Sequence, residues 1–180
     1  MNRKDLNSKK MIIGYHTQEH RGISFLAKPI QCLAKNAWLG VGYYFWVEEL
    51  YARYWGEDFK KQTGFYDIYS GLIDDEKFIN ATFSEDGYYF FRAKIDVAIT
   101  YLKDSGVDVT LAKVHRFLAE KIWPKLGITG IIYDDLPHNV DHKARIYSEV
   151  KPLYYKKRIQ IVVFDDSKIA NFAPHLTKLA

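Results

Sequence analysis

Short segments rich in β-branched and aromatic residues recur along the chain from residue 11 onward. Segments of this length and composition, with apolar side chains on one or both faces, are typical of β-strands. Polar and glycine-containing stretches of uneven length separate them, as expected for turns and loops. The pattern predicts strands at Met11–His16, Gly42–Phe45, Tyr66–Ile73, Thr129–Tyr133 and Ile159–Phe164.

Between the second and third of these strands, the apolar positions change to helical spacing. Val47–Lys61 carries acidic residues at its start and two lysines at its end, which suits the helix dipole. We expect a helix there whose buried face consists of Val47, Leu50, Tyr51 and Tyr54.

Two further helices are predicted in the middle of the chain. Ser84 is a suitable N-cap for a helix that runs to about Lys103 and ends at the turn Asp104-Ser105-Gly106. Thr110 is the corresponding cap of a second helix, with Pro124 just past its end. Its inward positions are expected to be Val114, Phe117, Leu118 and Ile122.

The order of these elements lacks the regular strand–helix alternation of a parallel sheet. Short strands with uneven connections predict an α+β domain with a split, mostly antiparallel sheet and flanking helices. The 180 residues suit one domain. No repeat or linker divides them, so we expect residues 11–180 to form one domain. Residues 1–10 are expected to form a mobile N-terminal arm.

Composition and chain chemistry exclude several classes of protein. Aromatic residues make up 16% of the chain, which is too many for a disordered protein. The one cysteine, Cys32, excludes a disulfide framework and a zinc site of several thiolates, and we expect it to be a small buried apolar residue. The longest apolar run, Trp38–Val47, is about half of what a membrane-spanning helix needs. We therefore expect a cytoplasmic protein with no membrane partner.

The net charge of +4 is concentrated in one segment, from His138 to Arg158. A local excess of positive charge favours a polyanionic neighbour, such as a dinucleotide phosphate or a nucleic acid. On charge alone, a solvated surface loop is an equally good interpretation. The segment holds two acidic residues, Asp141 and Glu149, against six basic ones, which are Lys143, Arg145, Lys151, Lys156, Lys157 and Arg158.

Common catalytic and nucleotide-binding motifs are missing. There is no P-loop, no HExxH and no GxSxG. Gly40-Val41-Gly42 is followed by aromatic residues instead of a third glycine, so it is not a dinucleotide fingerprint. His16 and His20 have helical metal-ligand spacing, but the flanking Gly14 and Gly22 argue against a helix, so no metal site is expected.

Three strand-associated motifs remain. The first is Gly14-Tyr15-His16-Thr17, where an apolar strand ends on a His-Thr pair. The second, Leu39–Trp46, reads LGVGYYFW and leads into the first predicted helix. The third, Ile159–Ile169, reads IQIVVFDDSKI, a strand followed by an acidic turn and a returning segment.

In this order and spacing, the motifs resemble those of the His-Tyr-Glu class of ADP-ribosyltransferases. That class includes poly(ADP-ribose) polymerases, diphtheria-type toxins and small bacterial and phage toxins. Its members have a strand ending in His-Gly, then G-x-G-[IFY]-Y-[FL] before a helix, and finally a strand E-Y-[IV]-V-[YF]-[DN]-P-[ST]-x-[IV]. The segment Leu126–Ile132 is similar to a G-Y-D-G-I-I stretch of many such toxins. The resemblance covers about residues 11–175.

The resemblance implies NAD as the substrate and assigns roles around the nicotinamide. Tyr44, or Tyr43 if the register is shifted by one, would stack on the cationic ring. Tyr54 or Trp55 would form the opposite wall. His16 would bind a ribose hydroxyl, and the backbone near Thr17 the carboxamide. Thr17 replaces the family's glycine and is expected either to tilt the nicotinamide or to narrow the pocket.

Gln160 stands where the family has its catalytic glutamate, and Asp166 replaces the family's proline. If this register is wrong, Glu149 is the best carboxylate. A glutamine can fix the ribose by a hydrogen bond but cannot deprotonate an acceptor. We therefore expect mono-ADP-ribosyl transfer by a toxin or effector. Its acceptor is expected to bind Lys156, Lys157 and Arg158 and to be a nucleic acid in preference to a protein.

Two other functions remain open. One is a non-catalytic module of the same fold that binds NAD, ADP-ribose or nucleic acid. The other is NAD glycohydrolysis or a phosphotransferase reaction like that of the tRNA 2′-phosphotransferases, although their paired arginines are not evident. A transferase active in its own host's cytosol also implies an antitoxin or chaperone partner.

Overall fold

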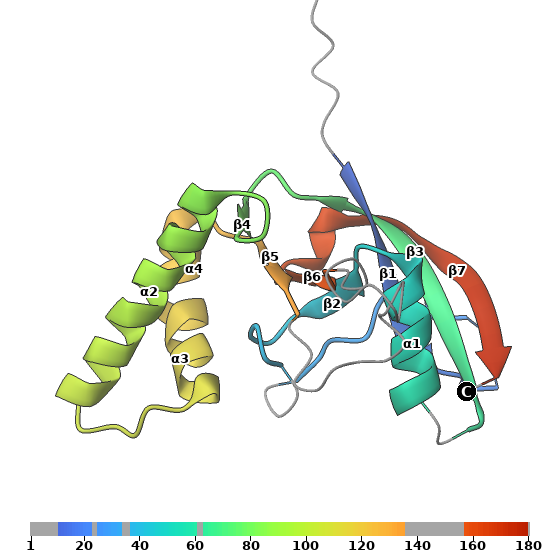
Figure 1. Cartoon of the computed structure of the whole chain (residues 1–180), viewed down its shortest axis with the longest axis horizontal. Coiled ribbons are helices and arrows are strands. Elements are labelled where there is room, and N and C mark those ends of the chain that lie inside the picture. The colour runs from blue at the N-terminus through green and yellow to red at the C-terminus, as the bar shows by residue number, and fades with distance from the viewer. Residues whose placement is uncertain (1–10, 23–24, 34–36, 61–62, 136–156, 180) are drawn as a thin grey trace, which may run out of the picture.

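The computed structural model describes residues 11–22, 25–33, 37–60, 63–135 and 157–179 (Figure 1). These residues form a seven-stranded sheet in the order β4-β5-β6-β2-β1-β3-β7. Its β4–β5 pair is parallel and the other neighbours are antiparallel, which confirms the expected α+β class and mostly antiparallel sheet. The strands are β1 (Met11–Glu19), β2 (Tyr43–Trp46), β3 (Phe65–Asp74), β4 (Phe78–Asn80), β5 (Gly130–Asp134), β6 (Ile159–Val163) and β7 (Ile169–Leu179).

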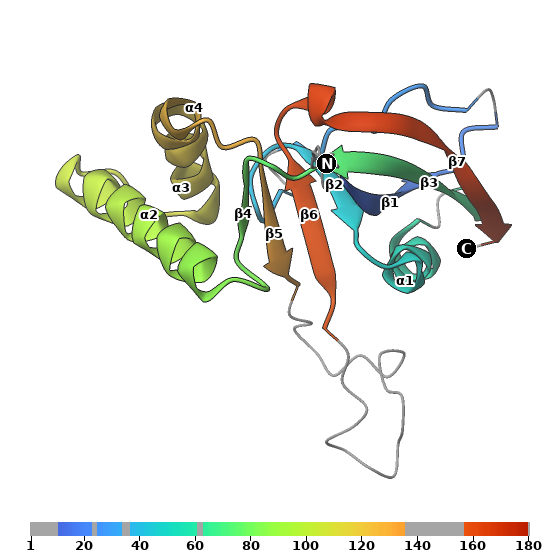
Figure 2. The ribbon, with the colours of Figure 1, turned by 90° about the horizontal axis from the view of Figure 1, so that it is seen from above.

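The two faces of the sheet are covered differently. Alternation along the strands puts Tyr15, Trp46 and Gln160 on one face, which we call the helix face. His16 and Phe45 point to the other face, the loop face, where their rings lie 5.6 Å apart. The segment after β1 crosses the loop face, and α1 (Glu49–Phe59) packs on the helix face (Figure 2).

Helix α1 packs closely on the sheet where two of its three buried residues are small, while the third, Tyr51, fills the core beside Trp46. Ala52 is fully buried and Gly56 is buried, whereas Leu50 is 39% exposed. The predicted inward position of Leu50 is therefore wrong. A leucine on that face would hold the helix away from the sheet, while Gly56 lets it approach the ring of Tyr66.

A helical hairpin packs at the β4–β5 end of the sheet. It consists of α2 (Glu85–Asp104), α3 (Leu111–Phe117), a π-helical turn (Leu118–Ile122) and α4 (Trp123–Leu126). The predicted caps are confirmed, since Ser84 accepts from Gly87 N and Thr110 from Lys113 N. The expectation for Pro124 is wrong: it lies in the first turn of α4, where the missing N–H leaves no intrahelical hydrogen bond unmade.

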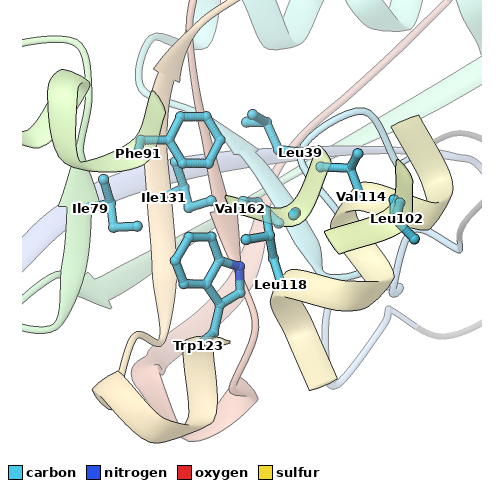
Figure 3. Packing of buried hydrophobic residues seen from close by; sticks show 10 residues of the cluster. Leu39, Ile79, Phe91, Leu102, Val114, Leu118, Trp123, Ile131 and Val162 are labelled. Atoms are coloured by element: carbon cyan, nitrogen blue, oxygen red, sulfur yellow. The ribbon is translucent and has the colours of Figure 1, made fainter. Parts of the chain in front are cut away.

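The hairpin is joined to the sheet by one apolar cluster (Figure 3). Phe91 of α2 stacks with Trp123 at a ring distance of 6.3 Å, and both contact the cluster that contains Ile131 of β5 and Val162 of β6. The burial of these large side chains stabilises the domain by about 1.5–3 kcal/mol each. The central strands of the sheet are therefore anchored to the hairpin from the helix face.

Two strands were not predicted from the sequence. β4 is a three-residue strand whose partner, β5, lies about fifty residues later in the chain. β7 contains Pro174 and a left-handed Asn171, at φ +52, and its pairing with β3 includes register shifts. Neither segment shows the uninterrupted apolar pattern that a strand usually carries.

We predict that Gly56→Ala destabilises the protein, although alanine is the better helix former by about 1 kcal/mol. The added Cβ would overlap the ring of Tyr66, so the free energy of unfolding should fall by about 1–3 kcal/mol in urea denaturation. Leu50→Ala, on the same helix but exposed, is the control and should change stability by less than about 1 kcal/mol. A stabilised Gly56→Ala variant would contradict this packing.

Candidate functional site

The three motif strands lie side by side in the centre of the sheet. β2 stands between β6 and β1, with Trp46 opposite both Gln160 and Tyr15. The sequence positions 16, 44 and 160 are thus brought together by strand pairing. Their side chains, however, do not all share one face.

His16 is buried on the loop face at the point where β1 and β2 separate. Its Nδ1 lies 2.9 Å from the carbonyl oxygen of Tyr44, and its Nε2 lies 3.4 Å from the backbone N of Ile30. The carbonyl accepts and the amide donates, so Nδ1 carries the proton and Nε2 is an acceptor. The 3.4 Å contact is long, so Nε2 is weakly engaged.

The electrostatic surroundings keep His16 neutral. Burial lowers the pKa of His16 to about 4, the hydrogen bond to the Tyr44 backbone opposes this shift, and the charge of Lys60 adds to it. A neutral ring with a fixed tautomer presents one acceptor nitrogen throughout the physiological pH range. Such a nitrogen is suited to a hydroxyl donor.

Beyond His16, β1 and β2 are no longer paired with each other. Thr17 pairs with Ile68 of β3, while Tyr44 pairs with Val162 of β6. The hydroxyl of Thr17 donates to the carbonyl of Ala52 in α1 at 2.8 Å, and Thr17 is 7% exposed. Thr17 therefore fills the space between β1 and the helix.

Tyr44 lies on the helix face, and both hydrogen-bonding capacities of its hydroxyl are used. The oxygen accepts from Leu39 N at 2.7 Å, and the hydroxyl donates to the carbonyl of Gly40 at 2.9 Å. Burial raises the pKa of Tyr44 well above its usual range. Tyr43 points to the loop face, where it packs against the cluster around Phe45. The two register alternatives thus lie on opposite sides of the sheet.

Gln160 is 6% exposed and lies on the helix face. Its Oε1 accepts a hydrogen bond from the indole Nε1 of Trp38 at 2.7 Å. Strand alternation puts this side chain on the opposite face from His16. The structure therefore places Gln160 beside Tyr44 in the sheet, but the sheet itself separates it from the His16 ring.

The candidates for a second aromatic wall also lie on the helix face. Trp55 stacks on Phe59 at 4.2 Å and is tilted toward Trp46 at 6.0 Å, and Tyr54 contacts the ring of Tyr51 at 6.2 Å. They belong to the cluster under α1, whereas Tyr44 packs with the cluster under the helical hairpin. No wall directly opposite Tyr44 is formed by these side chains in the described residues.

The basic stretch is described at its C-terminal end. Lys157 pairs with Asp134 at 2.9 Å, and Arg158 pairs with Asp135 at 2.8 Å and lies 5.3 Å from the Trp46 ring. The carboxylates at the end of β5, Asp134 and Asp135, thus offset two of the expected acceptor-binding charges. Lys156 and the alternative carboxylate Glu149 lie outside the described residues, as does most of the stretch from His138 and the arm at residues 1–10.

Sequence reasoning missed two residues near this site. Trp38 was part of an apolar run, and nothing in that run indicated a hydrogen bond to Gln160. His115 is 6% exposed and packs against Gly40, which has a φ of +100. Burial lowers the pKa of His115, and a hydrogen bond to the Trp38 backbone opposes this shift. Its helical spacing beside Val114 gave no sign of this contact.

Other expectations concern metals, membranes and Cys32. Among the described residues, no group of three or more His, Cys, Asp or Glu side chains is arranged to hold a metal ion. None of the helices in the described ranges is long and apolar enough to cross a membrane. Cys32 is half-buried rather than fully buried, and burial raises the pKa of its thiol.

Comparison with known proteins adds no family to this description. No protein-family model, no curated protein and no solved structure gives a significant match to the chain.

The depressed pKa of His16 predicts a pH dependence of stability. The unfolded chain binds a proton on this residue below about pH 6.5, whereas the folded chain does so only near pH 4. Stability from His16 is therefore present above pH 6.5 and is lost as the pH falls toward 4. The loss should amount to about 3 kcal/mol.

Urea denaturation at a series of pH values tests this, with His16→Gln as the non-titrating comparison. The decline between pH 7 and pH 4 should be shallower in the variant, while the contributions of carboxylates and of His115 are common to both proteins. Equal slopes would show that His16 is not held neutral.

Proposed function

We propose that this chain is an NAD-dependent mono-ADP-ribosyltransferase that modifies a macromolecular acceptor. One observation carries the proposal: the three motifs that resemble that class lie far apart in sequence, yet form the adjacent strands β6, β2 and β1. Strand order is not determined by the motifs themselves. Their meeting at the centre of one sheet therefore supports the resemblance independently.

The His16 ring supports a role in binding ribose. With Nδ1–H donated to Tyr44, its Nε2 can accept from a sugar hydroxyl. The competing bond from Ile30 N is 3.4 Å long, so a ligand would replace a weak partner. The segment after β1 would have to shift to admit the sugar.

The proposed nicotinamide position is where β1 and β2 diverge. The face of the Tyr44 ring would lie on one side of it and Thr17 on the other. The hydrogen bond from Thr17 to Ala52 occupies this space, so NAD binding requires that contact to open.

Gln160 limits the reaction that can follow. As an uncharged amide it cannot deprotonate an acceptor, and its oxygen already accepts from Trp38. Catalysis would then rest on binding and on the electrostatics of the bound ribose, as for other reactions through an oxocarbenium-like transition state. Single transfers to an acceptor that is already nucleophilic are the consequence, and a nucleic-acid acceptor is favoured by the positive net charge.

A second candidate is a non-catalytic module of the same fold that binds NAD or ADP-ribose. The position of Gln160 favours it, because this side chain and His16 lie on opposite faces, and none of the carboxylates in the described part of the chain is hydrogen-bonded to the His16 ring. NAD binding without turnover would distinguish the module from the transferase. Nicotinamide release without any acceptor would instead indicate a glycohydrolase.

We expect His16→Ala and Tyr44→Ala each to abolish NAD turnover, a loss of at least about 100-fold. His16→Ala removes the ribose acceptor and Tyr44→Ala the stacking ring. Transfer of labelled ADP-ribose to protein, RNA and DNA fractions is the measurement, with thermal unfolding as the check on the fold. Tyr89→Ala, on the exposed side of α2, is the matched control and should stay active. Near-normal turnover in a folded His16→Ala or Tyr44→Ala protein would refute the site.

Restoring the family's residues should increase activity. Gln160→Glu supplies a carboxylate at the third motif, and Thr17→Gly removes the contact with Ala52 that closes the nicotinamide position. We predict that the double variant releases nicotinamide at least about ten times faster than the wild-type protein, which corresponds to about 1.4 kcal/mol in activation free energy.

The control replaces Gln160→Glu by Gln160→Met in the same double variant, because methionine has about the length of glutamate but no charge. If the double variant binds NAD but releases no nicotinamide, the non-catalytic module is the better assignment. If neither protein binds NAD in calorimetry, both candidate functions fail.

A further inference from the structure

A groove at the end of β1 has features that the proposed function does not use. Its volume is about 740 Å³, within the usual range for small-ligand sites. The last residues of β1 and the C-terminal end of α1 line it, and its chemistry comes from His20, Arg21, Phe59 and Lys60. Charged and aromatic side chains thus converge on one concave surface.

His20 is oriented by a buried carboxylate. Its Nδ1 lies 3.0 Å from both carboxylate oxygens of Asp67, which is 6% exposed. The hydroxyl of Thr177 in β7 donates to the same carboxylate at 2.7 Å. With Nδ1–H directed to Asp67, the imidazolium form of the ring keeps its Nε2–H as a donor for a further acceptor. This arrangement fixes the ring as metal-binding and catalytic histidines are fixed by their carboxylate partners.

The polar end of the groove favours an anion. Arg21 is exposed and Lys60 is partly exposed, and both line the groove beside His20. One carboxylate in the lining, Glu19, accepts from the hydroxyl of Thr63 at 3.4 Å. The cationic donors therefore outnumber the carboxylates that face the groove. Guanidinium, ammonium and imidazole groups together are a typical phosphate-binding set.

The other end of the groove is aromatic. Phe59 is 62% exposed, and its ring stacks on Trp55 at 4.2 Å with an interplanar angle of 28°. Such a backed, exposed ring offers its free face to a second flat ring, such as a nucleotide base. An aromatic platform beside a cationic end matches a base and its phosphate.

We propose that this groove binds a nucleotide, with the phosphate on His20, Arg21 and Lys60 and the base on Phe59. Free mononucleotides and the exposed end of a nucleic-acid strand share this chemistry. The groove lies on the last residues of β1, past its pairing with β2, so it is a neighbour of the proposed NAD position rather than the same site. Lys60 lies between the two, because its charge lowers the pKa of His16. The proposal does not depend on ADP-ribosyl transfer.

Titrations with adenosine monophosphate, inorganic pyrophosphate and a short single-stranded oligoribonucleotide test the site. We expect adenosine monophosphate to bind and to shift the ring ¹⁵N signals of His20 but not those of buried His115. His20→Gln and Lys60→Gln should each weaken its binding at least about tenfold. Phe59→Ala should weaken the binding of adenosine monophosphate but leave the binding of pyrophosphate unchanged. Leu50→Ala, at an exposed position, should change the binding of neither.

Thr177→Val tests the positioning of His20 by Asp67. It removes one hydrogen bond of the carboxylate, so the ring ¹⁵N signals of His20 should change in the free protein and the nucleotide should bind less tightly. A folded His20→Gln protein that binds as tightly as the wild type would overturn the proposal. So would competitive displacement of adenosine monophosphate by NAD, because the groove would then be part of the NAD site. Tighter binding of the oligoribonucleotide would identify a strand end as the source of the phosphate.

Discussion

The hydrogen bond from the His16 ring to the Tyr44 carbonyl links β1 and β2 where their backbone pairing ends. On one side of it, Tyr15 still pairs with Trp46, and beyond it each strand keeps only its other neighbour, β3 for β1 and β6 for β2. Without the imidazole, a central carbonyl would lack this partner inside the sheet, at a cost of about 1–3 kcal/mol. The same bond fixes the proton on Nδ1, so the fold and the acceptor character of Nε2 have one cause.

This junction also explains why the sheet has two unlike faces. Helices pack where small or flat side chains allow close approach, as Ala52 and Gly56 do on the helix face. On the loop face, Tyr69 instead stacks on Phe172 of β7, and its hydroxyl oxygen accepts a hydrogen bond from Leu26 N at 3.3 Å. The His16 ring therefore meets a loop, whereas Thr17 on the opposite face of β1 meets helix α1.

Sequence patterns predicted much of the fold but little of the site's geometry. Five strands were found because their β-branched and aromatic runs are local signals, and the caps at Ser84 and Thr110 depend on residues three positions apart. β4 and β7 depend on partners elsewhere in the chain, so local composition did not show them. The face of the sheet on which His16 or Gln160 lies follows from strand register, which is a property of the assembled sheet. Likewise, Asp67 and Thr177 are separated by 110 residues, a distance that no motif spans.

The two hydrogen bonds of the Tyr44 hydroxyl have a consequence for any flat molecule that meets this ring. Held by Leu39 and Gly40, the phenol cannot swing about its side-chain bonds, so its orientation is set before a ligand arrives. Ordering a mobile aromatic side chain on binding would cost about 0.5–1.5 kcal/mol, and here that cost is already met during folding. The same two bonds occupy the hydroxyl, so the residue offers a stacking surface and no proton. A ligand stacked on Tyr44, as the proposed function requires, would therefore meet a rigid ring that recognises it by shape alone.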